Sequence, residues 1–162
     1  MSNSLKLAVV TGASSGIGAA TATLFANNGY QVIAGARRLD RLQALAATNP
    51  NIEVHELDVT NQASVDNFVK AINGRAVDVL INNAGGAFDS SSVLDSDPAI
   101  WSKSYEVNVV GTVRMTKAVA PSMIQNGNGH IVIISSTAGH VAYENGGSYV
   151  AAKFAERSLA NT

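Results

Sequence analysis

Short apolar runs alternate along the chain with segments rich in helix-forming residues. The apolar runs predict strands over residues 5–10, 31–36, 52–57, 77–81 and 130–136. The segments between and after them predict helices over 19–27, 39–47, 62–72 and 98–125, and a last helix from Tyr149 onward. Asp97 and Pro98 have the pattern of an N-cap and a first helical position, and Pro121 is expected to bend or shorten the long helix.

The predicted strands are apolar on both faces, which is typical of strands buried in a parallel sheet between two layers of helices. Because strands and helices alternate, the connections are expected to be right-handed crossovers. The chain has no linker, repeat or low-complexity tract that would divide it. The pattern therefore predicts one α/β domain over residues 1–162, with a doubly wound parallel sheet of the Rossmann-like type.

Composition excludes several classes of protein. Of the 162 residues, 46% are apolar and 14% are charged, which argues against disorder and against membrane insertion. The net charge of −1 provides no basic field for nucleic acid. The absence of cysteine excludes disulfides, thiolate metal sites and cysteine nucleophiles, and the N-terminal residues do not have the pattern of a secretion signal. We therefore expect a cytoplasmic protein, and no bound metal, since His55, His130 and His140 lack metal-ligand spacing.

Three glycines lie between the first predicted strand and the first predicted helix. In a doubly wound sheet this turn lies at the carboxyl end of a central strand, where the amides of a helix N-terminus favour an anion, and glycines let a pyrophosphate approach the backbone. An ordinary glycine-rich turn is the alternative, and the spacing G-x-x-x-G-x-G departs from the fingerprint G-x-G-x-x-G. The position after a strand and before a helix favours a dinucleotide site. The predicted cofactor loop comprises Gly12, Ser14, Ser15, Gly16, Ile17 and Gly18.

The end of the second predicted strand indicates which dinucleotide is bound. An NAD site places an acidic residue there to accept hydrogen bonds from the ribose 2′-hydroxyl. This chain has Ala36, Arg37 and Arg38 instead, and a guanidinium matches a 2′-phosphate in charge and geometry. We therefore predict NADP(H) in preference to NAD(H), with Arg37 as the main phosphate ligand, Arg38 near the adenine, and Ser14 or Ser15 as further donors. The alternative is a solvated basic start to the second helix.

Tyr149 and Lys153 are four residues apart, so a helix places both on one face. A phenol is a poor base at neutral pH, and about 4 kcal/mol of preferential stabilisation of its phenolate form would be needed to change that. A neighbouring ammonium and an oxidised nicotinamide would supply it. Tyr149 would then give a proton to a carbonyl oxygen or take one from an alcohol. Ser136, at the end of the fifth predicted strand, should face the same cleft and bond the substrate oxygen.

These motifs together resemble one family. The cofactor loop, then Asn82-Asn83-Ala84-Gly85, then Ser136 followed by Tyr149 and Lys153, are similar to the pattern of short-chain dehydrogenases/reductases, and the resemblance covers essentially the whole chain. It implies the strand order 3-2-1-4-5 and selects Ser136 over Ser135 by its spacing from the tyrosine. It also implies that Asn108 holds a water that links Lys153 to solvent. Without the resemblance, an asparagine among apolar residues would be interpreted as a buried polar group whose hydrogen bonds are satisfied.

The resemblance implies further cofactor contacts and an assembly. Asn82, Ala84 and Gly85 would close the fourth strand beside the adenosine half of the cofactor, and Asp58 and Val59 would flank the adenine. Because they lie between Ser136 and Tyr149, His140, Tyr143, Glu144 and Asn145 are candidates for contact with the substrate, and Phe88 and the serines after it are candidates for the other side of the pocket. Family members of this type form homodimers or homotetramers through the two helices from Pro98 and from Tyr149, and the apolar residues proposed for that interface are Val109, Val113, Val119 and Phe154.

The predicted function is hydride transfer between NADP(H) and a small-molecule carbonyl or secondary alcohol, the EC 1.1.1.- class, with Tyr149 as general acid and base. Members of the family are longer, so the resemblance also implies that the usual C-terminal strands and the loop over the substrate are missing and that the chain is truncated. Two alternatives remain at this point. One is a nucleotide-binding module without turnover, and the other is a catalytically incompetent fragment that retains only nucleotide binding.

Overall fold

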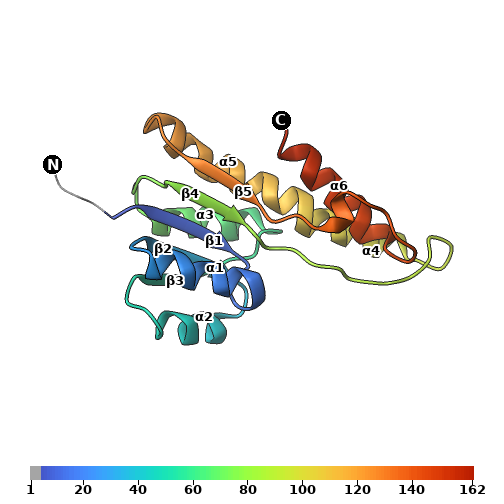
Figure 1. The fold of residues 1–162 in the computed structure, drawn as a ribbon, viewed down its shortest axis with the longest axis horizontal. Coiled ribbons are helices and arrows are strands. Elements are labelled where there is room, and N and C mark those ends of the chain that lie inside the picture. Colours follow the sequence, from blue (N-terminus) through green and yellow to red (C-terminus); the bar gives the residue numbers. More distant parts are fainter. Residues whose placement is uncertain (1–4) are drawn as a thin grey trace.

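Five parallel strands form a single sheet at the centre of the protein. The computed structural model describes residues 5–162, with strands β1 (Leu7–Thr11), β2 (Gln31–Ala36), β3 (Ile52–Glu56), β4 (Val79–Asn82) and β5 (His130–Ile133). Their order in the sheet is β3-β2-β1-β4-β5, and each neighbouring pair is parallel (Figure 1). The predicted fold class and strand order are confirmed.

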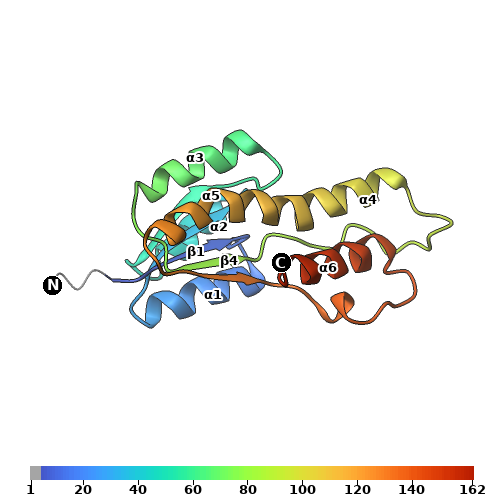
Figure 2. The same ribbon diagram turned by 90° about the horizontal axis from the view of Figure 1, so that it is seen from above.

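Helices cover both faces of this sheet. They are α1 (Gly16–Asn27), α2 (Leu39–Ala46), α3 (Gln62–Ile72), α4 (Pro98–Tyr105), α5 (Gly111–Gln125) and α6 (Gly147–Leu159), with a π-helical turn η1 (Glu106–Val110) between α4 and α5 and a 3₁₀ turn η2 (Thr137–Gly139) before α6. Figure 2 shows α3 and α5 on one side of the sheet and α1 on the other. In Figure 1, α4 and α6 lie beyond the carboxyl ends of the strands, where the loops of the site also gather.

Alternation of side chains along the strands produces two separate cores. Val9 of β1 packs with Phe68 of α3 and Met115 of α5 on one face. Val10, the next residue of β1, packs with Ala22 of α1 and Leu42 of α2 on the other face. Both faces are therefore buried, as the apolar strand pattern predicts.

Several element boundaries differ from the sequence-based expectation. The fifth strand ends at Ile133, so Ser136 lies outside it, and the last helix begins at Gly147. Asp97 caps α4 as predicted, because its carboxylate accepts a hydrogen bond of 2.8 Å from the amide of Ala99. Pro121 does not stop α5, which continues to Gln125.

Two of the residues expected at a subunit interface are in the core. Val109 is 7% exposed and Val119 is 1% exposed, because their helix faces pack inward. Val119 is part of the core on the α3 and α5 face. Of the four apolar residues proposed for an interface, Phe154, at 41% exposure, is an exposed large side chain. The four residues thus do not form one exposed apolar face.

Candidate cofactor and active site

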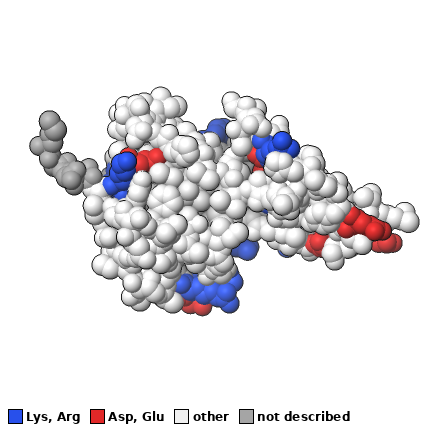
Figure 3. Space-filling view, viewed as in Figure 1, with Lys and Arg blue, Asp and Glu red and all other residues white. Residues whose placement is uncertain are grey.

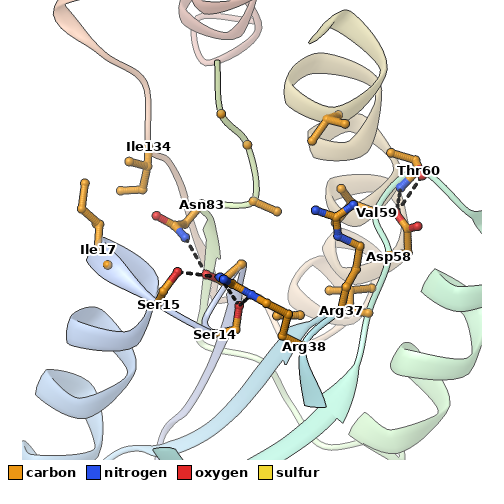
Figure 4. A pocket seen from close by; sticks show the side chains of 18 of the residues that line it. Ser14, Ser15, Ile17, Arg37, Arg38, Asp58, Val59, Thr60, Asn83 and Ile134 are labelled. Carbon is orange, nitrogen blue, oxygen red and sulfur yellow. Dashed lines mark hydrogen bonds between the residues drawn. The ribbon is translucent and has the colours of Figure 1, made fainter. Parts of the chain in front are cut away.

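A cleft of about 510 Å³ lies at the carboxyl ends of the strands, and the loops after β1, β2, β3, β4 and β5 all contribute to it (Figure 4). This is the position at which open α/β sheets bind their ligands. The cleft brings together most of the residues predicted from the sequence: Gly12, Ser14, Ser15, Gly16, Ile17, Arg37, Arg38, Asp58, Val59, Ala84, Gly85, Tyr149 and Lys153. Phe88 also lines it, whereas residues 140–145 are exposed and do not.

Each of the three glycines in the cofactor loop has a different structural role. Gly12 has φ +67°, and a Cβ there would lie 2.8 Å from the Cα of Ala84. Gly16 has φ +56°, but a Cβ there would meet nothing and would project into open space at the cleft. Gly18 does not line the cleft, and its Cβ would lie 2.6 Å from the carbonyl oxygen of Gly12. Gly18 therefore allows α1 to pack against the loop, while Gly16 leaves the cleft open.

The cofactor loop is tied to the loop after β4 by polar contacts. The hydroxyl of Thr11 accepts hydrogen bonds of 3.0 Å from the amides of both Asn83 and Ala84. The side-chain amide of Asn83 donates to the carbonyl oxygens of Thr11 at 3.0 Å and Gly12 at 3.3 Å. These contacts fix the glycine loop relative to the fourth strand.

Asn83, rather than Asn82, lines the cleft. Asn82 is buried on the other side of β4, where its amide donates to the hydroxyl of Thr116 at 3.2 Å. Neighbouring residues at a strand end point to opposite faces, so a shift of one position exchanges the two roles. The structure thus places Asn83, Ala84 and Gly85 of this motif at the cleft, and the expectation that Asn82 lies beside the cofactor's adenosine half stays a prediction.

The two arginines after β2 point to different parts of the cleft (Figure 4). The Arg38 guanidinium donates to the hydroxyl of Ser14 at 2.9 and 3.1 Å and to the hydroxyl of Ser15 at 2.7 Å. Arg37 lies on the side of Asp58 and acts on that carboxylate by its charge. Arg38 and the two serines thus form a group of donors beside the glycine loop, a place the sequence analysis gives to Arg37.

Asp58 is held in its ionised form. Burial by itself would raise the pKa of Asp58, but hydrogen bonds from the amide and hydroxyl of Thr60, at 2.9 and 2.7 Å, and the charges of Arg37 and Arg114 lower it overall. Val59 follows it at the edge of the cleft. The loop after β3 thus offers a negative charge and an apolar side chain, as the sequence analysis expects for this position.

Tyr149 and Lys153 meet at the other end of the cleft. The Lys153 ammonium nitrogen lies 5.6 Å from the centre of the Tyr149 ring. Lys153 is only 5% exposed, and its ammonium donates to the carbonyl oxygen of Ile134 at 3.0 Å. The predicted pair thus lines one part of the cleft, with the lysine fixed from below by the backbone of the strand-end loop.

Ser136 does not line the cleft. Its hydroxyl accepts a hydrogen bond of 3.1 Å from the amide of Ala138 and so caps η2. Ser135, the alternative rejected by spacing, lines the cleft and donates to the carbonyl oxygen of Lys153 at 3.3 Å. Of the two serines, Ser135 thus lines the cleft and contacts the backbone of Lys153, and the assignment of Ser136 stays a prediction.

Asn108 is fully buried in the π-helical turn η1. Its side-chain amide donates to the carbonyl oxygens of Gly86 at 3.0 Å and Ser104 at 2.8 Å, and its oxygen accepts from the Gly86 amide at 3.0 Å. A Cβ on Gly85 would collide with this oxygen and lie 3.6 Å from the Lys153 ammonium nitrogen. Asn108 therefore fixes the 85–86 segment beside Lys153, without lining the cleft itself.

Some lining residues were not found from the sequence. Several are apolar residues at strand ends, and others are direct neighbours of a predicted residue. Neither group belongs to a motif of its own in the sequence. A search for residue types that do chemistry passes over them. They are Ala36, Leu57, Thr60, Asn83, Gly86, Val107, Ile134 and Ser135. Within residues 5–162 no group of three or more histidine, aspartate or glutamate side chains is placed to hold a metal, and no helix is long and apolar enough to span a bilayer.

Comparisons with known proteins agree with this geometry. The family model described as short chain dehydrogenase matches residues 6–162. The chain is 38% identical over 150 residues to the NADP-dependent 3-hydroxy acid dehydrogenase YdfG of Salmonella typhi, covering 91% of this chain and 60% of that protein. It resembles the closed form of serine dehydrogenase complexed with NADP⁺ with TM-score 0.91 and 35% identity, covering 94% of this chain and 63% of that one. It resembles the alcohol dehydrogenase of the archaeon Thermococcus sibiricus, complexed with 5-hydroxy-NADP, with TM-score 0.90 and 34% identity, covering 96% and 68%.

Proposed function

The chain belongs to the short-chain dehydrogenase family, and we propose that it is an NADP(H)-dependent oxidoreductase that interconverts a carbonyl and a secondary alcohol. The observation that supports this most is that a glycine-rich loop at a helix N-terminus and the Tyr149–Lys153 pair line one continuous cleft. The chain spans 60% of the length of its relative YdfG, so the activity of the whole protein is part of the proposal.

The residues of the cleft fit a dinucleotide phosphate. Gly12 lets the cofactor loop pack against Ala84, Gly16 leaves the space at the α1 N-terminus open, and the α1 amides there favour a pyrophosphate. Arg38, Ser14 and Ser15 form a cluster of donors for a 2′-phosphate. Relatives named as NADP-dependent or complexed with NADP⁺ support the same preference for NADP(H) over NAD(H). A bound nicotinamide would supply or accept the hydride.

Within this proposal each catalytic side chain has one task. Tyr149 gives its phenolic proton to the substrate oxygen during reduction and takes it back during oxidation. Lys153 stabilises the phenolate with its ammonium charge. Ser136 or Ser135 donates a hydrogen bond to the substrate oxygen, and Asn108 holds the loop beside Lys153 in place. The substrate is a small molecule, and its carbonyl must reach the phenolic oxygen.

Replacement of Tyr149 by phenylalanine tests the catalytic part. We expect kcat for NADPH-dependent carbonyl reduction to fall by about 10²- to 10⁴-fold, because the variant keeps the ring but has no proton to transfer. The Kd for NADPH, measured by fluorescence titration, should change little. An equal kcat in the variant would contradict the role of Tyr149. Binding of NADPH without turnover by the unchanged chain would instead favour a nucleotide-binding module.

Single alanine substitutions test the cofactor part and separate the two arginines. We expect Arg38→Ala to raise the Kd for NADPH by about 10- to 100-fold, the range for a lost hydrogen-bonded charge, and to leave the Kd for NADH nearly unchanged. Arg37→Ala is the matched control, since it removes an equal charge from the next residue. A selective loss of NADPH affinity in Arg37→Ala alone would return the main role to Arg37. Loss in neither variant would contradict a role of either arginine in holding the 2′-phosphate.

We also propose that the protein assembles as a homodimer or homotetramer. The support is limited to the exposed side chains of Phe154 on α6 and Tyr105 on α4. Light scattering coupled to size-exclusion chromatography would give the mass in solution. A mass of one chain at all concentrations tested would contradict this part of the proposal and leave the others unaffected.

A further inference from the structure

Helix α6 contains a second buried charge that the proposed reaction does not use. Glu156 follows Lys153 by three residues and is 2% exposed. Its carboxylate oxygen Oε2 lies 2.6 Å from the Lys153 ammonium nitrogen, and both side chains are almost completely buried. A carboxylate is rarely buried without a partner, because removing its charge from water is costly. The position of Glu156 therefore needs an explanation, and Lys153 is the group it contacts.

The other ionisable groups near this part of α6 do not compete for Glu156. The helix packs against α4, η1 and η2. Glu106 of η1 pairs with Arg114 at 2.6 Å. Asp89, in the loop between β4 and α4, accepts a hydrogen bond of 2.6 Å from the hydroxyl of Ser148. Among the residues the structure describes, Lys153 is the one ion-pair partner of Glu156. The remaining titratable groups on or beside these elements are Lys103, Tyr105, His140, Tyr149 and Arg157, none of them bonded to Glu156.

We propose that Glu156 is a positioning residue that orients the Lys153 ammonium and keeps it charged beside Tyr149. An ammonium has three N–H donors. The carbonyl oxygen of Ile134 accepts one at 3.0 Å, while the Glu156 carboxylate lies 2.6 Å from the nitrogen as an ion-pair partner without hydrogen-bond geometry, and Lys153 lines the cleft. One hydrogen bond and one ion pair on the same nitrogen restrict where its remaining N–H groups point, as supporting contacts do in other preorganised sites. The role in catalysis rests on the proposed function, whereas the ion pair itself does not.

The electrostatics show why the carboxylate depends on this partner. Burial raises the pKa of Glu156 overall, and the charge of Lys153 offsets only part of that rise. Without the lysine, the buried carboxylate would become neutral more readily still. Glu156 reaches the proton that Tyr149 transfers only through the position of Lys153.

Amine labelling tests the pair without any need for turnover. Lys153 is compared with exposed Lys103 in the same sample, by limited reductive methylation and peptide mass spectrometry across a pH series. We expect Glu156→Gln to shift the Lys153 labelling profile toward lower pH, which raises its rate near pH 8 by about tenfold relative to Lys103. A change in access alone would raise the rate equally at every pH. Asp66→Asn is the matched control, because it removes an exposed carboxylate on α3 and should leave the profile unchanged.

Kinetics test the effect on catalysis. With NADPH and a reducible carbonyl, Glu156→Gln should lower kcat by about tenfold with little change in KM, and its loss of activity at high pH should begin at a lower pH than in the wild type. Glu156→Asp keeps the charge and should recover part of kcat. If the wild type binds NADPH but shows no turnover, the proposed function fails and the labelling result still decides the pair.

Three results would overturn the inference. One is a Lys153 labelling profile that is the same in Glu156→Gln and wild type. Another is a Glu156→Asp variant as impaired as Glu156→Gln while both unfold at the wild-type temperature. The third needs no variant of Glu156: the Lys153 ammonium should give a slowly exchanging ¹H–¹⁵N signal at neutral pH, assigned by its loss in Lys153→Arg, and its absence would contradict a buried, paired ammonium.

Discussion

Two glycines of the cofactor loop give a sharp test of how the loop works, because they share a backbone conformation and differ in the space around them. Gly12 and Gly16 both have positive φ, at +67° and +56°. A methyl group at Gly12 would lie 2.8 Å from the Cα of Ala84, whereas a methyl group at Gly16 would meet nothing within 4 Å. Alanine at each position therefore separates backbone strain from lack of space.

The expected loss of stability follows from these two contributions. A non-glycine residue in the left-handed region costs about 1 kcal/mol, which applies to both variants. Overpacking adds about 1–3 kcal/mol at Gly12, since the obstacle is backbone and must shift. We therefore expect Gly16→Ala to lower the free energy of unfolding by about 1 kcal/mol and Gly12→Ala by about 2–4 kcal/mol.

Urea denaturation followed by circular dichroism measures this difference. With a slope of about 2 kcal/mol/M, the midpoint of Gly12→Ala should lie about 1 M below that of Gly16→Ala. The effect on NADPH affinity should be large at Gly16, because the added methyl group would project into the cleft. We expect the Kd of Gly16→Ala for NADPH to rise by about tenfold or more. Equal midpoints would refute the contact with Ala84. Full NADPH affinity in Gly16→Ala would refute the assignment of this space to the cofactor.

Two further substitutions test the edge of the sheet and the buried amide. Burial by itself would raise the pKa of Glu53, but hydrogen bonds and charges from His55 and Arg75 lower it overall. The contribution of Glu53 to stability is therefore present above the unfolded pKa of 4.5 and is lost as the pH falls through the folded pKa. Thermal melts should show Glu53→Gln less stable than wild type by at most about 1 kcal/mol at pH 7 and equal to wild type near pH 3. Asn108→Ala should cost about 2–3 kcal/mol in urea denaturation, because both the amide and the carbonyl of Gly86 lose a buried partner, and an unchanged midpoint would show that this segment is held by other contacts.

The fold was predictable because its signal is repeated along the chain. Four of the five strands contain an apolar run, the fifth (β3) alternates apolar and polar residues, and a helical segment lies in each crossover, so boundary errors of up to three residues did not change the topology. The π-helical turn that holds Asn108 was not predicted. A local widening of a helix depends on how its side chains pack, and no sequence period distinguishes it from a regular helix.

The site was predictable as a set of loops and less so as individual side chains. The motifs identify the turns after the strands, but whether Asn82 or Asn83 faces the cleft depends on where β4 ends, which the apolar run gives only to within a residue or two. The same applies to Ser135 and Ser136 after β5. Glu156 had no motif at all, and a glutamate three residues after a lysine on a helix usually indicates a solvated pair.

The loop after β4 links the two ends of the cleft into one unit. Its first two residues are fixed to the cofactor loop by the Thr11 hydroxyl, and Gly86, three residues further along, is fixed to η1 by Asn108. Between them, Gly85 leaves room for Asn108 and lies close to the Lys153 ammonium. A displacement of the glycine loop must therefore move this segment and the surroundings of Lys153 with it. This is why we expect Gly12→Ala to affect the position of Lys153 as well as the binding of the cofactor, whereas Gly16→Ala, whose added methyl group meets neither segment, should affect stability and cofactor binding and leave Lys153 in place.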